Sequence, residues 1–198
     1  MTPEQTLAFL GFSIVVAGTP GPSNAVLTAT GANVGVVRGL SALLGVAAGM
    51  AVLMFVVAFG LGTIILETPL LSTAVKWAGA AVLFWLAWKI ATSRGTGVDK
   101  GARPIGFLGA AAFQWVNPKS WLACTSAAAA FLDQSRGSAH LQAAMLALIF
   151  VLAALPCCFV WLAFGAVVRR ALRSERALRT FNVVMGALLA ASVVLLIR

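Results

Sequence analysis

Charged side chains are scarce in this chain. Only 10% of its 198 residues are charged, whereas 61% are hydrophobic, and the mean hydropathy is +1.00. A soluble domain carries about 25% charged residues, so this sequence has too little polar surface to cover a globule in water. The chain is therefore predicted to be an integral membrane protein.

Groups that bind metals or activate nucleophiles are also few. The chain has one histidine and three cysteines, with no CxxC or HExxH spacing. The cysteines lie within apolar runs and are interpreted as small packing residues. The serine of "GPSN" at 21–24 faintly resembles a protease nucleophile turn, but His140 lies at the end of a different apolar run. No cofactor and no metal are predicted, and an intramembrane enzyme stays an alternative.

Six apolar runs have about the length that a helix needs to cross a bilayer core of about 30 Å. They cover residues about 6–30, 40–66, 69–92, 105–132, 139–168 and 178–197. The polar, Gly-rich linker of about 93–104, "SRGTGVDKGARP", divides the chain into two halves of three spans each. We therefore expect one all-α transmembrane domain over residues 1–198, with repeats of about 1–92 and about 105–198.

Basic residues gather in alternate connections between these runs. The first connection holds Arg38, the third holds Lys89, Arg94, Lys100 and Arg103, and the fifth holds Arg169, Arg170, Arg173, Arg176 and Arg179. The positive-inside rule places these connections in the cytoplasm and both termini outside it. The net charge of +9 is thus explained by membrane orientation, and no nucleic-acid partner is predicted. Because Glu4 and no basic residue precede the first run, that run is expected to be a retained span.

Prolines interrupt the first run of each half. "TPGPSN" occupies 19–24 and "NPK" occupies 117–119, and a shift of 98 positions places Pro20 on Pro118. Since three spans is an odd number, two halves of the same fold must be inverted relative to each other, as in many secondary transporters. The sequence therefore predicts six transmembrane helices in two inverted three-helix repeats, with the first and fourth helices broken.

A proline break has chemical consequences in a membrane. Proline removes a backbone donor and frees a carbonyl of the preceding turn, and freed carbonyls need partners in hydrocarbon. A broken helix is therefore tolerated where it lines a wet cavity. Half-helix N-termini favour carboxylates and half-helix C-termini favour cations, and an amino acid zwitterion carries both charges. The alternative for each proline is a purely structural kink.

Ten residues around the two breaks are predicted to form a substrate site. The amides of Asn24 and Asn117 can donate and accept hydrogen bonds, although helix capping is the other interpretation. Lys119 lies near the middle of a span, where charge is expensive and usually functional. We expect it to meet a substrate carboxylate or freed carbonyls, with snorkelling to the interface as the alternative. The full set is Thr19, Pro20, Gly21, Pro22, Ser23, Asn24, Gln114, Asn117, Pro118 and Lys119.

No acidic residue lies near the middle of an apolar run, although proton-coupled pumps often keep a carboxylate there. Proton coupling would therefore use Glu67 or Asp133 near span ends, Lys119, or the substrate itself. The chain has no filter motif and no mid-span ring of acids, which argues against a channel. An exporter of another small solute or cation stays an alternative.

The motifs resemble those of the LysE/RhtB family of bacterial amino acid exporters. The resemblance is carried by "TPGPSN", the following "GANVGVVRGL", "WAGAAVLFWLAWKIATS" in the third run and "NPKSW" in the fourth. The family usually shows two Asn after Pro-Gly-Pro, and Ser23 replaces the first of them here. The sequence looks closest to the branch that exports cysteine and O-acetylserine, while related branches export threonine, homoserine, lysine and leucine.

The resemblance implies a secondary active exporter in the bacterial inner membrane that uses alternating access driven by the proton gradient. Its expected partners are a small amino acid and the lipid bilayer. The resemblance also implies association between copies, so a homodimer is an expected assembly.

Overall fold

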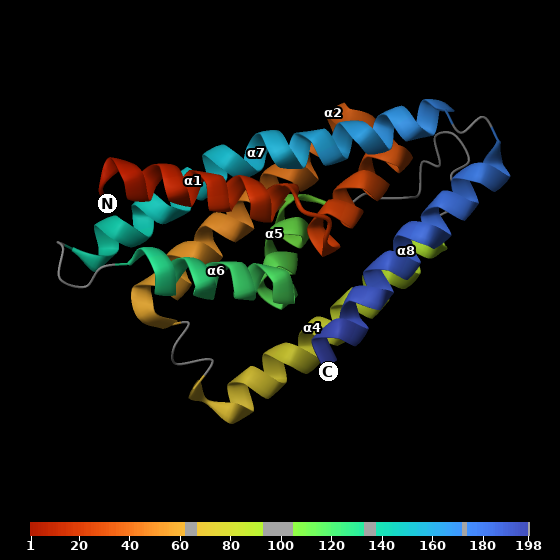
Figure 1. Ribbon diagram of the computed structural model, residues 1–198. Helices are drawn as coiled ribbons and strands as arrows, with labels where there is room; N and C mark the ends of the chain where they lie inside the picture. Colours follow the sequence, from red (N-terminus) through yellow and green to blue (C-terminus); the bar gives the residue numbers. More distant parts are fainter. Residues whose placement is uncertain (62–66, 93–104, 133–137, 172–173, 198) are drawn as a thin grey trace.

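The computed structural model describes residues 1–61, 67–92, 105–132, 138–171 and 174–197, and every element in these ranges is helical (Figure 1). The elements are α1 (Pro3–Gly18), α2 (Pro22–Val56), the short π-helix η1 (Val57–Leu61), α4 (Pro69–Ala91), α5 (Phe107–Val116), α6 (Pro118–Phe131), α7 (Ala139–Ala171) and α8 (Glu175–Ile197). The all-α prediction is therefore confirmed for the described residues. The predicted linker of about 93–104 lies outside them.

Three of these helices are long and apolar enough to cross a membrane. They cover Pro22–Gly60, Ser72–Ala91 and Ala139–Ala171, and α5 is a shorter apolar helix. Their length and composition agree with the membrane class deduced from the scarcity of charge. The arrangement of six spans in two repeats stays a prediction.

Both predicted helix breaks are present. α1 ends at Gly18, Thr19 is extended, and Pro22 occupies the first turn of α2. In the same way, α5 ends at Val116, Asn117 is extended, and Pro118 begins α6. The physical reason is shared, because proline has no N–H to give and its fixed φ suits the first turn of a helix.

The connection expected around Arg38 is a turn at the single residue Gly35 instead of a loop. The chain stays helical from Pro22 to Val56 except at Gly35, whose φ of 80° and ψ of 176° suit glycine and few other residues. Figure 1 shows that α2 changes direction sharply along its length. Arg38 therefore lies in helix, and Arg169 of α7 binds the carbonyl oxygen of Asn33 just before the turn at 2.9 Å.

Glycines allow the helices of the bundle to approach closely. A Cβ on Gly31 would overlap the Leu162 carbonyl of α7, and one on Gly165 would overlap the Thr28 carbonyl of α2. The Gly45 and Gly49 pair in the second run packs against the backbone of α5, again too closely for a side chain. This spacing of small residues is typical of tight helix pairs in membranes. These contacts hold α2 closely against α7 and α5.

Helices α4 and α8 form a separate pair beside this bundle (Figure 1). They meet closely at Gly186, where an added Cβ would lie 2.6 Å from the Ala87 carbonyl oxygen. α4 reaches the bundle at the second break, because Gly79 packs against the Val116 carbonyl and Leu83 joins a buried cluster with Phe113. The pair formed by α4 and α8 therefore packs against the bundle next to the second break.

Candidate functional site

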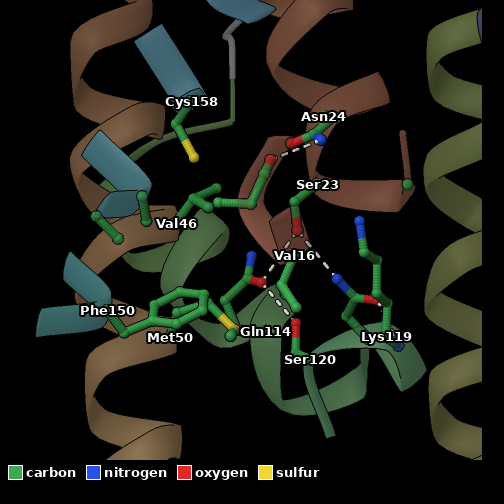
Figure 2. A pocket seen from close by; sticks show the side chains of 15 residues that line it. Val16, Ser23, Asn24, Val46, Met50, Gln114, Lys119, Ser120, Phe150 and Cys158 are labelled. Carbon is green, nitrogen blue, oxygen red and sulfur yellow. Dashed lines mark hydrogen bonds between the residues drawn. The ribbon is translucent and has the colours of Figure 1, made fainter. Parts of the chain in front are cut away.

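A pocket lies where the two helix breaks face each other (Figure 2). It contains about 430 Å³ of space not filled by protein atoms, a volume that includes space open to solvent. Residues of α1, α2, α5, α6 and α7 and of both breaks line it, whereas α4 and α8 do not contribute. The lining residues are Val16, Ala17, Gly21, Ser23, Asn24, Val46, Ala47, Met50, Gln114, Asn117, Lys119, Ser120, Phe150, Ala154 and Cys158.

Six of the ten residues predicted from sequence line this pocket. They are Gly21, Ser23, Asn24, Gln114, Asn117 and Lys119. The other four shape the breaks instead. Pro22 and Pro118 begin α2 and α6, and Thr19 and Pro20 are exposed in the first break, where their carbonyl oxygens accept hydrogen bonds. Fold topology thus brings together two segments that lie about a hundred residues apart.

The amide of Asn24 stabilises the broken end of α1. Its Nδ2 donates to the carbonyl oxygens of Ala17 at 3.0 Å and Thr19 at 2.7 Å. Trp161 of α7 donates from Nε1 to the Gly18 carbonyl at 3.3 Å. The freed carbonyls expected after a break in a membrane are therefore satisfied by side chains from neighbouring elements. For Asn24, the observed contacts are those of the capping interpretation.

Lys119, in the first turn of α6, binds the same helix end. Its Nζ donates to the carbonyl oxygens of Thr19 at 2.5 Å and Pro20 at 3.5 Å. The ammonium group thus lies at the negative end of the α1 dipole, where a cation is stabilised. Lys119 is half-buried and is the one charged side chain among the pocket residues that the structure describes. It meets freed carbonyls, one of the two environments expected for it.

A buried network connects the two breaks through Gln114. The hydroxyls of Ser23 and Ser120 donate to Gln114 Oε1 at 3.0 and 2.9 Å, and Asn117 Nδ2 donates to Ser23 Oγ at 3.0 Å (Figure 2). Gln114 is fully buried and Asn117 is 1% exposed. Among the described residues, no buried side-chain nitrogen or oxygen is left without a hydrogen-bond partner. Satisfied networks of this kind fix a single arrangement of their helices.

Asn117 serves both the network and the second break. Its Oδ1 accepts from the backbone N–H of Lys119 at 3.1 Å, which caps the N-terminus of α6. Its Nδ2 faces the first break and binds Ser23. The capping and site interpretations of Asn117 are therefore both compatible with its contacts.

Sequence reasoning missed several pocket residues. Ser120 lies three residues after Asn117, so helical spacing alone places it on the same face of α6. The apolar wall includes Met50 of α2 with Phe150 and Cys158 of α7. These three carry no sequence signal, because a pocket wall and a packed core use the same residue types. Cys158, predicted to be a packing residue, is buried and also lines the pocket.

The pocket has one polar side and one apolar side (Figure 2). Lys119 and Ser23 lie on one side, and Val46, Met50 and Phe150 lie on the other. Among the described residues that line it, none is acidic or a histidine. Within the described ranges, no group of three His, Cys, Asp or Glu side chains is placed to hold a metal ion.

Comparison with known proteins identifies the family. The sequence model of the LysE type translocators matches residues 14–198. The chain belongs to the LysE type translocator family. It is therefore a membrane transporter and not an enzyme, and the resemblance noted in its sequence is confirmed.

Curated relatives of this LysE family member carry a more specific name. The cysteine/O-acetylserine efflux proteins of Escherichia coli strain K12 and Shigella sonnei are 33% identical over 135 residues, which cover 67% of this chain and 68% of theirs. The protein of the same name from Salmonella typhimurium strain LT2 is 33% identical over 122 residues, covering 60% and 61%. No solved structure matches the chain.

Proposed function

We propose that this LysE family member exports small neutral amino acids of the cysteine and O-acetylserine type across the bacterial inner membrane. The observation that carries the proposal is the pocket between the two breaks, which combines one cation, neutral hydrogen-bonding groups and an apolar wall. The names of the relatives at 33% identity support the substrate class.

The polar side of the pocket suits the backbone of an amino acid. The Lys119 ammonium binds the substrate carboxylate, which is a stronger acceptor than a neutral carbonyl. The substrate ammonium binds neutral acceptors, such as Gln114 Oε1 or the hydroxyl of Ser23. Both groups already accept hydrogen bonds across the breaks. Substrate binding therefore replaces some of these hydrogen bonds within the protein by hydrogen bonds to the substrate.

The apolar side of the pocket suits a small uncharged side chain. Met50 and Phe150 close this side, and a compact side chain with a thiol or ester fits beside them. A lysine or arginine substrate would bring a second positive charge to a pocket that already holds Lys119 and has no acid among its described lining residues. Such a charge is unfavourable in a low-dielectric site, so basic amino acids are excluded.

Transport proceeds by alternating access of two inverted repeats, with the two breaks as the moving parts and the proton gradient as the driving force. The two helix breaks and their shared pocket support this view, because inverted repeats commonly place substrate at such interruptions. The proton carrier is Lys119, Glu67, Asp133 or the substrate itself. A homodimer is the proposed assembly.

The test is transport by the purified chain in proteoliposomes. We expect exchange or efflux of labelled cysteine and O-acetylserine, accelerated by an imposed proton gradient, and no transport of lysine. Lys119→Ala is expected to insert normally and to reduce cysteine transport by at least about tenfold, the effect of roughly 1.4 kcal/mol in binding.

Each alternative has its own outcome in the same assay. Transport that follows only the solute gradient would indicate a channel. Transport of a cation or another solute without any amino acid would overturn the proposed substrate class. Unchanged cysteine transport by Lys119→Ala would remove that residue from the mechanism.

A further inference from the structure

Gly21 lies under the side chain of Lys119 in the first break. A Cβ added to Gly21 would lie 2.7 Å from Lys119 Cδ and 3.1 Å from Lys119 Nζ. The nearer distance is shorter than a carbon–carbon contact allows, since such atoms attract best at about 3.5–4.0 Å. The methylene chain of Lys119 therefore passes directly over a position that has no side chain.

The backbone of Gly21 does not require glycine. Its φ of −177° and ψ of −178° are extended values that residues with a side chain also adopt. Gly35 and Gly60, in contrast, have positive φ angles. The atoms nearest to a Cβ added at Gly21 belong to the flexible end of Lys119, so a side chain at this position would displace the lysine rather than the backbone.

We propose that Gly21 is a positioning residue for Lys119. By leaving its Cα face open, Gly21 lets the lysine reach from α6 across to the end of α1 and rest on the Thr19 and Pro20 carbonyl oxygens. This position holds the ammonium at the edge of the pocket, because both Gly21 and Lys119 line it. The inference rests on the proposed function, in which this ammonium receives the substrate carboxylate.

The position of Lys119 also suits an exchange of partners. An ammonium group has three donors, and two carbonyl oxygens engage Lys119 in the structure. A carboxylate that enters the pocket binds the same group more strongly than a neutral carbonyl does. Substrate binding therefore draws Lys119 away from the Thr19 and Pro20 carbonyl oxygens, while Asn24 keeps its hydrogen bond to Thr19.

Gly21→Ala tests the role of Gly21, and Gly18→Ala is the matched control. Gly18 lies at the same break, and an added Cβ there meets no atom within 4 Å. We expect Gly21→Ala to raise the KM for cysteine by about tenfold, the effect of roughly 1.4 kcal/mol in binding, with a smaller change in kcat. Gly18→Ala is expected to change KM by less than about twofold, because most surface substitutions away from special features have small effects.

A double substitution separates positioning from a general defect. In the Lys119→Ala background there is no lysine chain to displace, so adding Gly21→Ala should lower transport no further. Coupled residues show such non-additivity, whereas independent sites add. If Gly21→Ala alone inserts poorly, the same double variant should recover the yield and monodispersity of Lys119→Ala. Additive losses, or no recovery of yield, would overturn the proposal.

A chemical measurement makes the inference independent of transport. The rate at which an amine-reactive acetylating reagent modifies Lys119, read by mass spectrometry in detergent without substrate, should rise in Gly21→Ala and stay unchanged in Gly18→Ala. A rise without any cysteine transport by the wild type would refute the proposed function and retain the positioning role. Wild-type transport with equal labelling and equal KM in all three proteins would refute the positioning role alone.

Discussion

At the scale of single residues, Gln114 is the buried acceptor that links the two helix breaks. It is fully buried, it accepts from the hydroxyls of Ser23 and Ser120, and its own Nε2 donates to the Ala110 carbonyl at 3.3 Å. The acceptor is thus shared by groups from two helices other than its own. Loss of that acceptor leaves buried donors unsatisfied, which is more expensive than the loss of one exposed hydrogen bond.

We therefore predict that Gln114→Met, which keeps the approximate size of the side chain, lowers the free energy of unfolding by about 1–3 kcal/mol. Equilibrium unfolding of the purified protein in mixed micelles measures this change. Ser120→Ala in the Gln114→Met background should cost less than it does in the wild type, because the hydroxyl has already lost its acceptor. Equal costs in the two backgrounds would show that the bond between Ser120 and Gln114 contributes nothing to stability.

The polar half of the pocket could be predicted at this scale, and the apolar half could not. Asn24, Asn117 and Lys119 are conspicuous because polar groups in apolar runs require a reason. Phe150 and Cys158 are not conspicuous, because phenylalanine and cysteine are among the residue types that are most often buried in protein cores. Ser120 lies between these cases, for its helical spacing from Asn117 places it on the site face.

At the scale of elements, the proline breaks and the glycine turn differ in how visible they are. Pro22 and Pro118 mark helix starts through a covalent property that acts in any context. Gly35 instead bends α2 by adopting a positive φ angle. Any glycine can adopt such an angle, and the tertiary packing decides which one does. The sequence therefore predicts a connection near Arg38 but does not show that a single non-helical residue, Gly35, makes it.

Gly35→Ala is predicted to destabilise the protein by about 1–3 kcal/mol. Its φ of 80° and ψ of 176° fall in a region that is essentially restricted to glycine, with strain of that size for other residues. No atom lies within 4 Å of an added Cβ, so the effect would come from the backbone and not from a clash. The midpoint of thermal unfolding in detergent reports it.

Gly11→Ala provides the control for this substitution. Gly11 lies within α1 and also has open space around an added Cβ, but its φ is not positive. Alanine is favoured over glycine in a helix by roughly 0.5–1 kcal/mol, so Gly11→Ala should be neutral or stabilising. A Gly35→Ala protein as stable as Gly11→Ala would contradict the strained turn.

At the scale of the whole molecule, the charge pattern and the fold together predict how the bundle is oriented in the membrane. Arg169 and Arg170 close α7, and Arg176 and Arg179 follow in α8. Arg169 also binds the Asn33 carbonyl before the turn in α2, so the basic end of α7 and this turn lie together. From the positive-inside rule we predict that this end of the bundle faces the cytoplasm.

Two exposed serines test this orientation. Ser174 precedes α8 at the basic end, and Ser138 precedes α7 at the other end of that helix. In a background without the three native cysteines, which must retain cysteine transport, a membrane-impermeant maleimide added to intact cells should label Ser138→Cys. It should label Ser174→Cys only after the inner membrane is permeabilised. The reverse labelling pattern would show that the basic end of α7 faces the outside of the cell. The orientation of Lys119 and the first break relative to the cytoplasm, where the substrate is made available, would then be reversed as well.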